Sequence, residues 1–161
     1  PTLFPDSRVT GGLMAADRPD GERADKVMKT GGDYSGPVVY EGVPFIGAQT
    51  GIEVDFPEAV VRDCVFADNR TDVLATEVAH GLLVEGARIL DAATRLGFIE
   101  LSGAAAVIRD NDSCHILVPI PLDGATVEVY DNTNCTYDLA AGTVFEGEVL
   151  TEPYVTGTAP A

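Results

Sequence analysis

Apolar residues come in short runs over the second half of the chain, and residues that favour turns separate these runs at short, even spacing. The Val, Ile, Thr and Tyr residues of the runs suit a pleated, half-buried surface, whereas the Asp, Asn and Gly residues between them accept the dihedrals of tight turns. In residues 125–130 apolar and polar side chains alternate, as a strand with one solvated face requires. The pattern predicts a mainly β protein. The apolar runs are residues 98–101, 104–108, 115–120, 126–130 and 143–150.

Asp123-Gly124 is the sharpest of the turn signals. It lies between residues 119–121 and 126–130, and an Asp-Gly pair readily supplies the type I′ turn of a two-residue β-hairpin. Residues 41–42 and 85–86, both Glu-Gly, stand between apolar runs in the same way and are also interpreted as hairpin turns. Because two-residue hairpins join only antiparallel strands, we expect antiparallel pairing.

The chain also contains an internal echo. Residues 52–63 align without gaps with residues 99–110, and six of the twelve positions are identical at an offset of 47 residues. A repeated strand–turn–strand–Asp unit indicates that successive stretches take up similar geometry. Two architectures produce such an echo: an antiparallel β-sandwich or barrel with duplicated halves, and a short parallel β-solenoid whose rungs end in Asp or Asn turns.

The spacing of the turn aspartates helps to choose between these two architectures. Asp63, Asp91, Asp110 and Asp131 close similar segments, but their intervals are uneven at 28, 19 and 21 residues. Stacked repeats favour a fixed period. We therefore expect an antiparallel β-sandwich or barrel with extended N- and C-terminal arms, and we keep the short parallel β-solenoid as the alternative.

Composition divides the chain into three parts. Residues 1–35 are rich in Gly, Asp, Arg and Pro, so they can scarcely form a core and are interpreted as an extended N-terminal arm. This arm is either a disordered tail or a segment that orders across a neighbouring subunit. Residues 36–150 form the β-rich domain, and residues 151–161 form a C-terminal arm. Short helices are predicted over residues 22–28 and 91–96.

The chain is strongly acidic. It has 26 acidic and 10 basic residues, a net charge of −16, and all of the excess lies outside the neutral residues 1–30. Such a body repels phosphate backbones, which argues against nucleic-acid binding. We interpret the acidity as a solubilising surface, the alternative being attraction to a cationic partner or to divalent cations.

Neither a membrane span nor export is expected. No apolar run approaches the roughly 18 residues that a membrane span requires. The first residues, Pro-Thr-Leu-Phe-Pro, lack the basic and apolar regions of a signal peptide. Without export, we expect Cys64, Cys114 and Cys135 to be three reduced, mostly buried thiols. Cys114 and Cys135 flank a predicted hairpin and could approach each other.

No catalytic, cofactor or metal site is predicted. His80 and His115 are the two histidines, and Cys114 precedes His115 directly, so these two side chains would point to opposite faces of a strand. No serine stands in a Gly-x-Ser-x-Gly setting, and no Gly-rich loop is followed by Lys. Residues 110–112, Asp-Asn-Asp, lack the Gly and distal Glu of a calcium loop. We therefore expect a protein that is not an enzyme.

Two segments resemble phage proteins. Residues 124–149 contain Val-Tyr-Asp-Asn and then Gly-Thr-Val, which is similar to a hairpin of small β-domains in tailed-phage virion proteins. Residues 36–49, which begin Gly-Pro-Val-Val-Tyr, resemble the opening strands of phage head-decoration proteins. The resemblance implies a structural virion protein that decorates and stabilises a capsid by bridging neighbouring subunits. It would be made in the host cytoplasm and located on the capsid surface.

The partners implied by this resemblance are the major capsid protein and copies of the chain itself, as a trimer at threefold positions. No cofactor is implied. The residues expected to contact partners are the apolar anchors of the two arms: Leu3, Phe4, Leu13, Met14 and Tyr154.

The alternative function belongs to the solenoid architecture. It is a tailspike-like protein that binds or cleaves polysaccharide, with Asp63, Asp110 or Asp131 stacked along one face of an acidic groove. A carbohydrate-binding β-sandwich is a third option, but the aromatic content of 7% without Trp argues against it. Regular rung spacing around the aspartates would favour the solenoid, and ordered termini contacting other chains would favour decoration.

Overall fold

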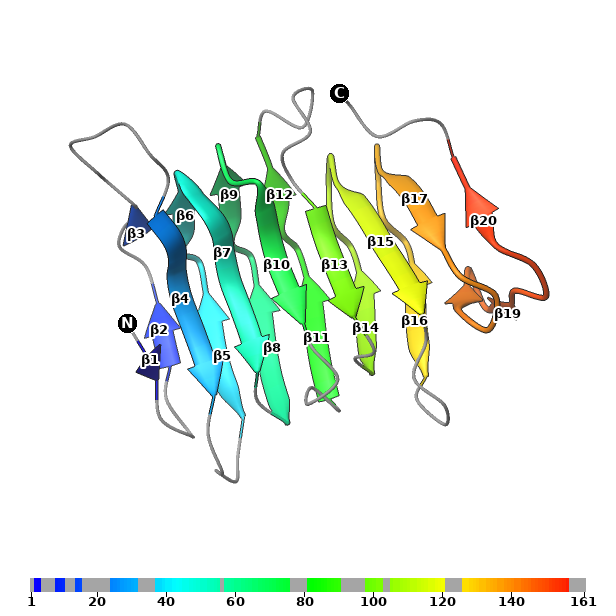
Figure 1. The fold of residues 1–161 in the computed structure, drawn as a ribbon, viewed down its shortest axis with the longest axis horizontal. Coiled ribbons are helices and arrows are strands. Elements are labelled where there is room, and N and C mark those ends of the chain that lie inside the picture. The colour runs from blue at the N-terminus through cyan, green and yellow to red at the C-terminus, as the bar shows by residue number, and fades with distance from the viewer. Residues whose placement is uncertain are drawn as a thin grey trace.

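In the computed structural model, the chain forms a parallel β-solenoid (Figure 1). The structure describes residues 2–3, 8–10, 14–15, 24–31, 37–55, 57–75, 81–90, 98–102, 105–120 and 126–156. These residues form three sheets of eight, eight and four strands, and no helix occurs among them. The mainly β prediction is confirmed, and the architecture is the solenoid alternative rather than the sandwich or barrel that the turn signals favoured.

Sheet 1 runs along one side of the solenoid. Its strands pair parallel in chain order, and only the last pair, β17 with β20, is antiparallel. Its members are β1 (Thr2–Leu3), β4 (Ala24–Gly31), β7 (Ala48–Asp55), β10 (Thr71–Ala75), β13 (Phe98–Ser102), β15 (His115–Ile120), β17 (Thr136–Leu139) and β20 (Tyr154–Val155).

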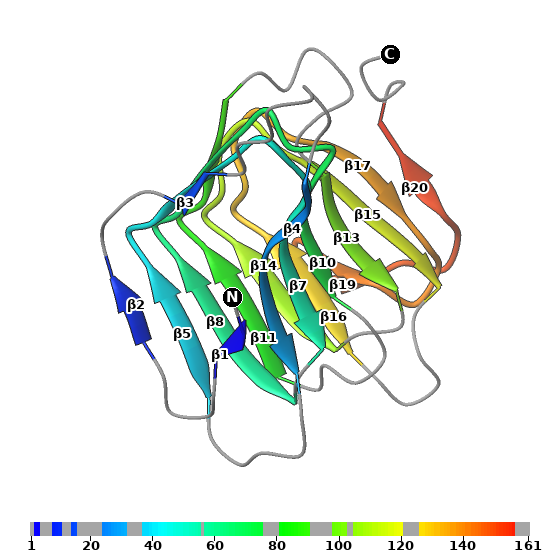
Figure 2. The ribbon, with the colours of Figure 1, turned by 60° about the vertical axis from the view of Figure 1, so that its left-hand side comes forward.

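Sheets 2 and 3 complete the cross-section. Figure 2 shows sheets 1 and 2 as the two long sides, with the strands of sheet 3 near the top. Sheet 2 contains β2 (Arg8–Thr10), β5 (Val38–Glu41), β8 (Glu58–Arg62), β11 (Gly81–Glu85), β14 (Ala106–Arg109), β16 (Val127–Tyr130), β18 (Val144–Phe145) and β19 (Glu148–Val149). Sheet 3 contains β3 (Met14–Ala15), β6 (Pro44–Ile46), β9 (Val65–Ala67) and β12 (Arg88–Ile89).

From β2 to β13 the chain visits sheet 2, then sheet 3, then sheet 1, and from β14 to β17 it alternates between sheets 2 and 1. Consecutive strands up to β18 therefore belong to different sheets. The three predicted hairpins are therefore wrong: β5 does not pair with β6, nor β11 with β12, nor β15 with β16. The Asp123-Gly124 turn itself lies outside the described residues. A turn signal marks where a strand ends, but it does not say whether the chain folds back or bends into the next sheet.

The internal echo spans two rungs. Ile52 pairs with Val73, and Val73 pairs with Ile99, so the offset of 47 residues joins strands that are two positions apart in sheet 1. In sheet 2, Ala59 and Ala106 stand on either side of Leu82 in the same way. The repeat was therefore correctly detected, but its unit is half the length that the alignment suggested.

The core fills the space between the three sheets. In sheet 2 every second side chain points inward and is buried, so the inward side chains form two rows along the solenoid. One row contains Val38, Leu82 and Val127, and the other contains Tyr40, Val84 and Val129. In sheet 3, Phe45 stacks on Phe66 with ring centroids 5.5 Å apart. Burial of each such large side chain contributes roughly 1.5–3 kcal/mol to folding.

Connections between sheets differ in length. Two residues separate sheet 2 from sheet 3 in each of the three rungs that contain β6, β9 and β12. The connections from sheet 1 to the next strand of sheet 2 contain between two residues, after β7, and six residues, after β15. The length of this corner therefore varies from rung to rung.

The terminal segments join the sheets. Within residues 1–35, β1 to β4 pair parallel with β4 to β7, so the described part of the predicted arm continues the solenoid of its own chain. The helix predicted over residues 22–28 is wrong, because β4 covers most of that range. β20 lies in the predicted C-terminal arm, and the helix predicted over residues 91–96 falls outside the described residues.

Candidate functional site

Three of the four aspartates singled out from the sequence gather at one corner of the solenoid, directly after the strands of sheet 2, and Asp91 lies outside the described residues. Asp63, Asp110 and Asp131 have φ values of 53–56°, and Gly42 and Gly86 hold the equivalent positions with φ values of 66° and 64°. These five residues follow one another at intervals of 21, 23, 24 and 21, so Gly86 and not Asp91 belongs to the series. Left-handed backbone favours Gly, Asn and Asp, which explains the composition of this column.

This corner is a turn and not a groove. A Cβ atom on Gly86 would lie 2.2 Å from Asp63 Oδ1, so the carboxylate of Asp63 fills the space above the next rung. All three aspartates are exposed. The structure thus brings them to one edge, as the solenoid hypothesis predicted, but separates Asp63 from Asp110 by the Gly86 rung.

Behind this corner, Asn111 and Asn132 form a buried ladder. Asn111 Oδ1 accepts a hydrogen bond from the Ala87 amide at 2.9 Å, and its Nδ2 donates to the Val84 carbonyl at 3.1 Å and to Asn132 Oδ1 at 2.9 Å. Asn132 Nδ2 donates in turn to Ile108 O at 3.1 Å. The ladder satisfies backbone groups that the turn removes from the sheets, so its role is structural.

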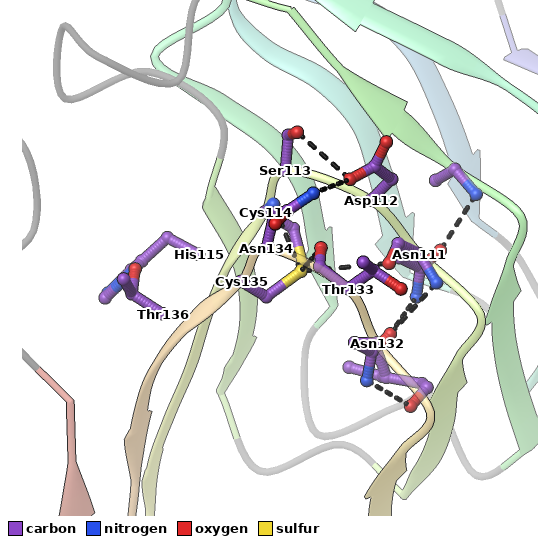
Figure 3. The surroundings of a disulfide bond; sticks show 12 residues. Asn111, Asp112, Ser113, Cys114, His115, Asn132, Thr133, Asn134, Cys135 and Thr136 are labelled. Carbon is purple, nitrogen blue, oxygen red and sulfur yellow. Dashed lines mark hydrogen bonds between the residues drawn. A yellow bond between two sulfur atoms is a disulfide. The ribbon is translucent and has the colours of Figure 1, made fainter.

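A disulfide joins Cys114 to Cys135 (Figure 3), which overturns the expectation of three reduced thiols. The two cysteines occupy the same position in neighbouring rungs, 21 residues apart, where stacking of the rungs brings their Cα atoms to 4.5 Å. Cys64 remains free and buried, and burial raises the pKa of its thiol to about 11. A search for cysteines one rung apart could have found the pair, but it requires knowledge of the solenoid period.

Polar groups surround the disulfide. Asp112 Oδ1 accepts hydrogen bonds from Asn134 Nδ2 and Ser113 Oγ, both at 3.1 Å, and the bond from Asn134 contributes most to lowering the pKa of this carboxyl. His115 Nδ1 lies 2.6 Å from Thr136 Oγ1, and burial lowers the pKa of the imidazole. These groups bond to one another across two neighbouring rungs, so they stabilise this corner against local unfolding.

One acidic side chain lies inside the solenoid. Asp72 is 1% exposed and stands at a register shift between β10 and β13. Its Oδ1 accepts a bond from Asn69 Nδ2 at 3.0 Å, and its Oδ2 has no hydrogen-bond partner among the described residues. Burial raises the pKa of this carboxyl to about 7. The group is enclosed in the core and does not open onto a described groove.

The C-terminal end of the solenoid differs from all of these corners, because it holds an open groove of about 510 Å³. Two aromatic rings, Phe145 and Tyr154, line it, and a third, Tyr137, packs against Phe145. Phe145 stacks on Tyr154 with centroids 4.9 Å apart, and Tyr137 meets the edge of Phe145 at 4.9 Å. The lining residues, which we call the C-terminal groove, are Phe145, Glu146, Glu148, Val149, Leu150, Thr151, Glu152, Pro153 and Tyr154.

Antiparallel pairing creates this groove. β18 turns back into β19 through Glu146 and Gly147, both with positive φ, and β20 then lies antiparallel on β17. Two hydrogen bonds fix the last segment: the Tyr137 amide donates to Thr156 Oγ1 at 2.7 Å, and the Thr156 amide donates to Tyr137 O at 2.9 Å. Tyr154 is thereby held over Phe145 while 38% of its surface stays exposed.

The rim of the groove is acidic. Glu146, Glu148 and Glu152 are exposed, and no arginine or lysine occurs in residues 145–156. Burial, and after it the charge of Glu146, raises the pKa of the Tyr137 hydroxyl. The groove therefore combines an exposed ring face with carboxylate acceptors, and it repels anions.

The five predicted contact residues lie in different parts of the chain. Tyr154 lies in the C-terminal groove. Leu3 and Met14 fall in β1 and β3, and Phe4 and Leu13 fall outside the described residues. Phe145, which stacks on Tyr154, was missed, because its place depends on the strand reversal at residues 146–147 and not on a sequence motif.

Two kinds of site do not occur within the described ranges. No group of three or more His, Cys, Asp or Glu side chains could hold a metal ion there. That part of the chain also contains no helix that is long and apolar enough to cross a membrane. No family model, curated protein or solved structure matches the chain.

Proposed function

We propose that this chain is a polysaccharide-binding β-solenoid that engages neutral or basic sugar residues in the C-terminal groove. The observation that carries the proposal is the Phe145–Tyr154 stack, which presents one exposed aromatic face beside three carboxylates. The proposed activity is binding, with no bond-breaking step assigned to the groove.

The chemistry of the groove suits a sugar ring. A pyranose has an apolar face of C–H groups that can lie on an aromatic ring, and its hydroxyl groups donate hydrogen bonds around the edge. Tyr154 would supply the ring, and Glu148 or Glu152 would accept the hydroxyl protons in charge-assisted bonds. A concave surface with a largely apolar base and a few polar groups is the usual form of a ligand site.

Charge restricts the ligand class. The chain carries a net charge of −16, and the groove adds three acids without a base. Polyanionic saccharides such as uronate chains would be repelled. Neutral glycans or amino-sugar chains therefore fit the proposal, and binding of amino-sugar chains should weaken as salt screens the carboxylates.

Two further observations support a polysaccharide ligand. The turn column has the regular spacing that the solenoid hypothesis required, with Gly86 in place of Asp91. The disulfide is typical of proteins that work in an oxidising compartment, where extracellular polysaccharides are found.

The experiment is a glycan-binding screen followed by calorimetry. The full chain is applied to neutral, amino-sugar and uronate polysaccharides, and the best ligand is titrated into wild type, Tyr154→Ala and Leu90→Ala. Leu90, 42% exposed, lies in another corner and serves as the matched control for loss of a large exposed side chain.

We expect Tyr154→Ala to weaken binding about tenfold, because one aromatic stack is worth roughly 0.5–1.5 kcal/mol beyond the buried area. Leu90→Ala should bind as wild type does. Absence of binding to every glycan class, preference for uronates, or equal loss in both variants would overturn the proposal.

The capsid-decorating function remains a prediction from the resemblance. It assigns Tyr154 a protein partner instead of a sugar. Co-sedimentation of the chain with candidate capsids separates the two functions, because decoration requires binding that soluble glycan does not displace.

A further inference from the structure

The outer face of sheet 2 carries two ordered rows of side chains. The first row is apolar, with Val39, Val60, Leu83 and Val107 in register on β5, β8, β11 and β14. All four are half-buried rather than fully exposed. Such a continuous apolar stripe on the outside of a sheet is uncommon in a protein that works alone.

The second row alternates in charge. Glu41, Arg62, Glu85 and Arg109 follow one another on the same four strands. Within the chain, Glu85 Oε2 lies 2.6 Å from Arg109 Nη2, and its Oε1 accepts a bond from Arg62 Nε. The bond from Arg62 contributes most to lowering the pKa of the Glu85 carboxyl, so this carboxyl stays ionised.

The order of these rows is self-complementary. Reversing the order of the four strands places Glu41 opposite Arg109 and Arg62 opposite Glu85, so every opposed charge pair is attractive. The same reversal places Val39 opposite Val107 and Val60 opposite Leu83, so apolar residues meet apolar residues.

We propose that this face joins two copies of the chain, related by a twofold axis that runs along the strands between β8 and β11. An isologous interface requires a surface that complements itself, and the two rows meet this requirement. Glu58, the remaining outward acid of β8, would lie opposite Gly81 of the second copy, where it meets no like charge.

The size of the face sets the strength of the dimer. Strands about 4.8 Å apart and four to five residues long give an area on the order of 300 Å² per copy over these four strands. The total of about 600 Å² lies below the usual range for stable complexes. The dimer should therefore be reversible and concentration-dependent, with half-association at tens to hundreds of micromolar protein.

The association is measured by sedimentation velocity of the full chain from micromolar to millimolar concentration. Leu83→Lys buries an unpaired charge at the centre of the interface and should weaken association at least tenfold. The matched control is Leu74→Lys, because Leu74 is an outward, half-buried leucine of β10 in sheet 1. It should leave the association unchanged.

Chemical cross-linking tests the axis itself. Val39→Cys and Val107→Cys are prepared separately and treated with a short bis-maleimide, alone and mixed. The proposed axis opposes position 39 to position 107 and shifts the two copies of either position sideways by three strand spacings, about 14 Å. Mixtures should therefore cross-link several-fold more than either variant alone. Cys64 is buried with a raised thiol pKa and should contribute little background.

The outcomes are distinct. A monomer at all concentrations, equal effects of the two lysine variants, or equal cross-linking within and between the cysteine variants would each overturn the proposed dimer. None of these results depends on the glycan ligand, so the two proposals stand or fall separately.

Discussion

All strand pairs formed among β1 to β18 are parallel, whereas β19 and β20 pair antiparallel with the strands beside them. In the parallel rungs the polar side chains at the corners bond to backbone or to one another, as Asn111 and Asn132 do. At the C-terminal end, three of the four large hydrophobic residues exposed among the described residues gather, namely Val149, Tyr154 and Val155. The corner side chains of the repeating part thus bond within the chain, whereas the departure from the repeat leaves large apolar side chains exposed.

The largest difference in the free energy of unfolding between these two regions is expected when a side chain that bonds buried polar groups is truncated. Asn111→Ala leaves the Ala87 amide and the Val84 carbonyl without partners and should lower the free energy of unfolding by about 4 kcal/mol, since each unsatisfied group costs roughly 1–3 kcal/mol. The matched change at the end, Thr156→Ala, removes one bond to the Tyr137 amide and should cost about 1 kcal/mol. Urea unfolding measures both, and equal losses would contradict the comparison.

The disulfide should have the next largest effect, because it ties together the last two parallel rungs. Replacing both Cys114 and Cys135 by Ala opens a loop of 21 residues and should cost about 3 kcal/mol. Cys64→Ala, the control, should cost about 1 kcal/mol because it truncates a buried side chain without opening a loop.

Amide hydrogen exchange shows which part of the solenoid is destabilised when the disulfide is removed. The Thr136 amide, which bonds to Cys114 O, should exchange faster in the double variant than the Arg88 amide, which bonds to Cys64 O in an earlier rung. Uniform acceleration along the chain would show that the disulfide supports the whole solenoid and not its C-terminal end.

The third prediction concerns Asp72, a carboxyl that is buried in the core. The folded-state pKa of Asp72, about 7, lies above the value of 3.8 expected for an unperturbed aspartate. Between these pH values the folded state binds more protons than the unfolded state, so stability should fall as pH rises from about 4 to about 7. The full effect is at most about 4 kcal/mol.

Asp72→Asn tests this assignment. At pH 8 the variant should be more stable than wild type by about 2 kcal/mol, because the gain from removing a buried charge exceeds the cost of one unsatisfied amide group. At pH 4 it should be no more stable than wild type. An unchanged slope of stability with pH in Asp72→Asn would place the titrating group elsewhere.

Much of the fold could be predicted from the sequence. The alternation in residues 126–130 correctly indicated a strand. The turn residues at 110–113 and 131–134 correctly marked corners, and the echo of residues 52–63 correctly indicated repetition. The sheet assignment could not be predicted, because an aspartate with left-handed backbone suits a hairpin and a solenoid corner equally well. The sequence pattern also placed Asp91 in a series to which Gly86 belongs, since both residue types accept positive φ.

The candidate site was less accessible to sequence reasoning. Tyr154 was chosen as an apolar anchor of a terminal arm, and its contact with Phe145 follows only from the reversal of the chain after β18. The Cys114–Cys135 pair likewise depends on which residues the rungs bring into register.

The connections between the sheets differ in how much their length varies, and this difference affects where insertions can be accepted during evolution. The connections from sheet 2 to β6, β9 and β12 each have two residues, the first with positive φ, so an insertion there would disturb the register of the rung that it enters. The connections from sheet 1 to sheet 2 already range from two to six residues, which shows that added length at this corner is absorbed locally. New loops, and with them new specificities, can therefore be grafted at one edge of the solenoid while the stacked rungs stay as they are.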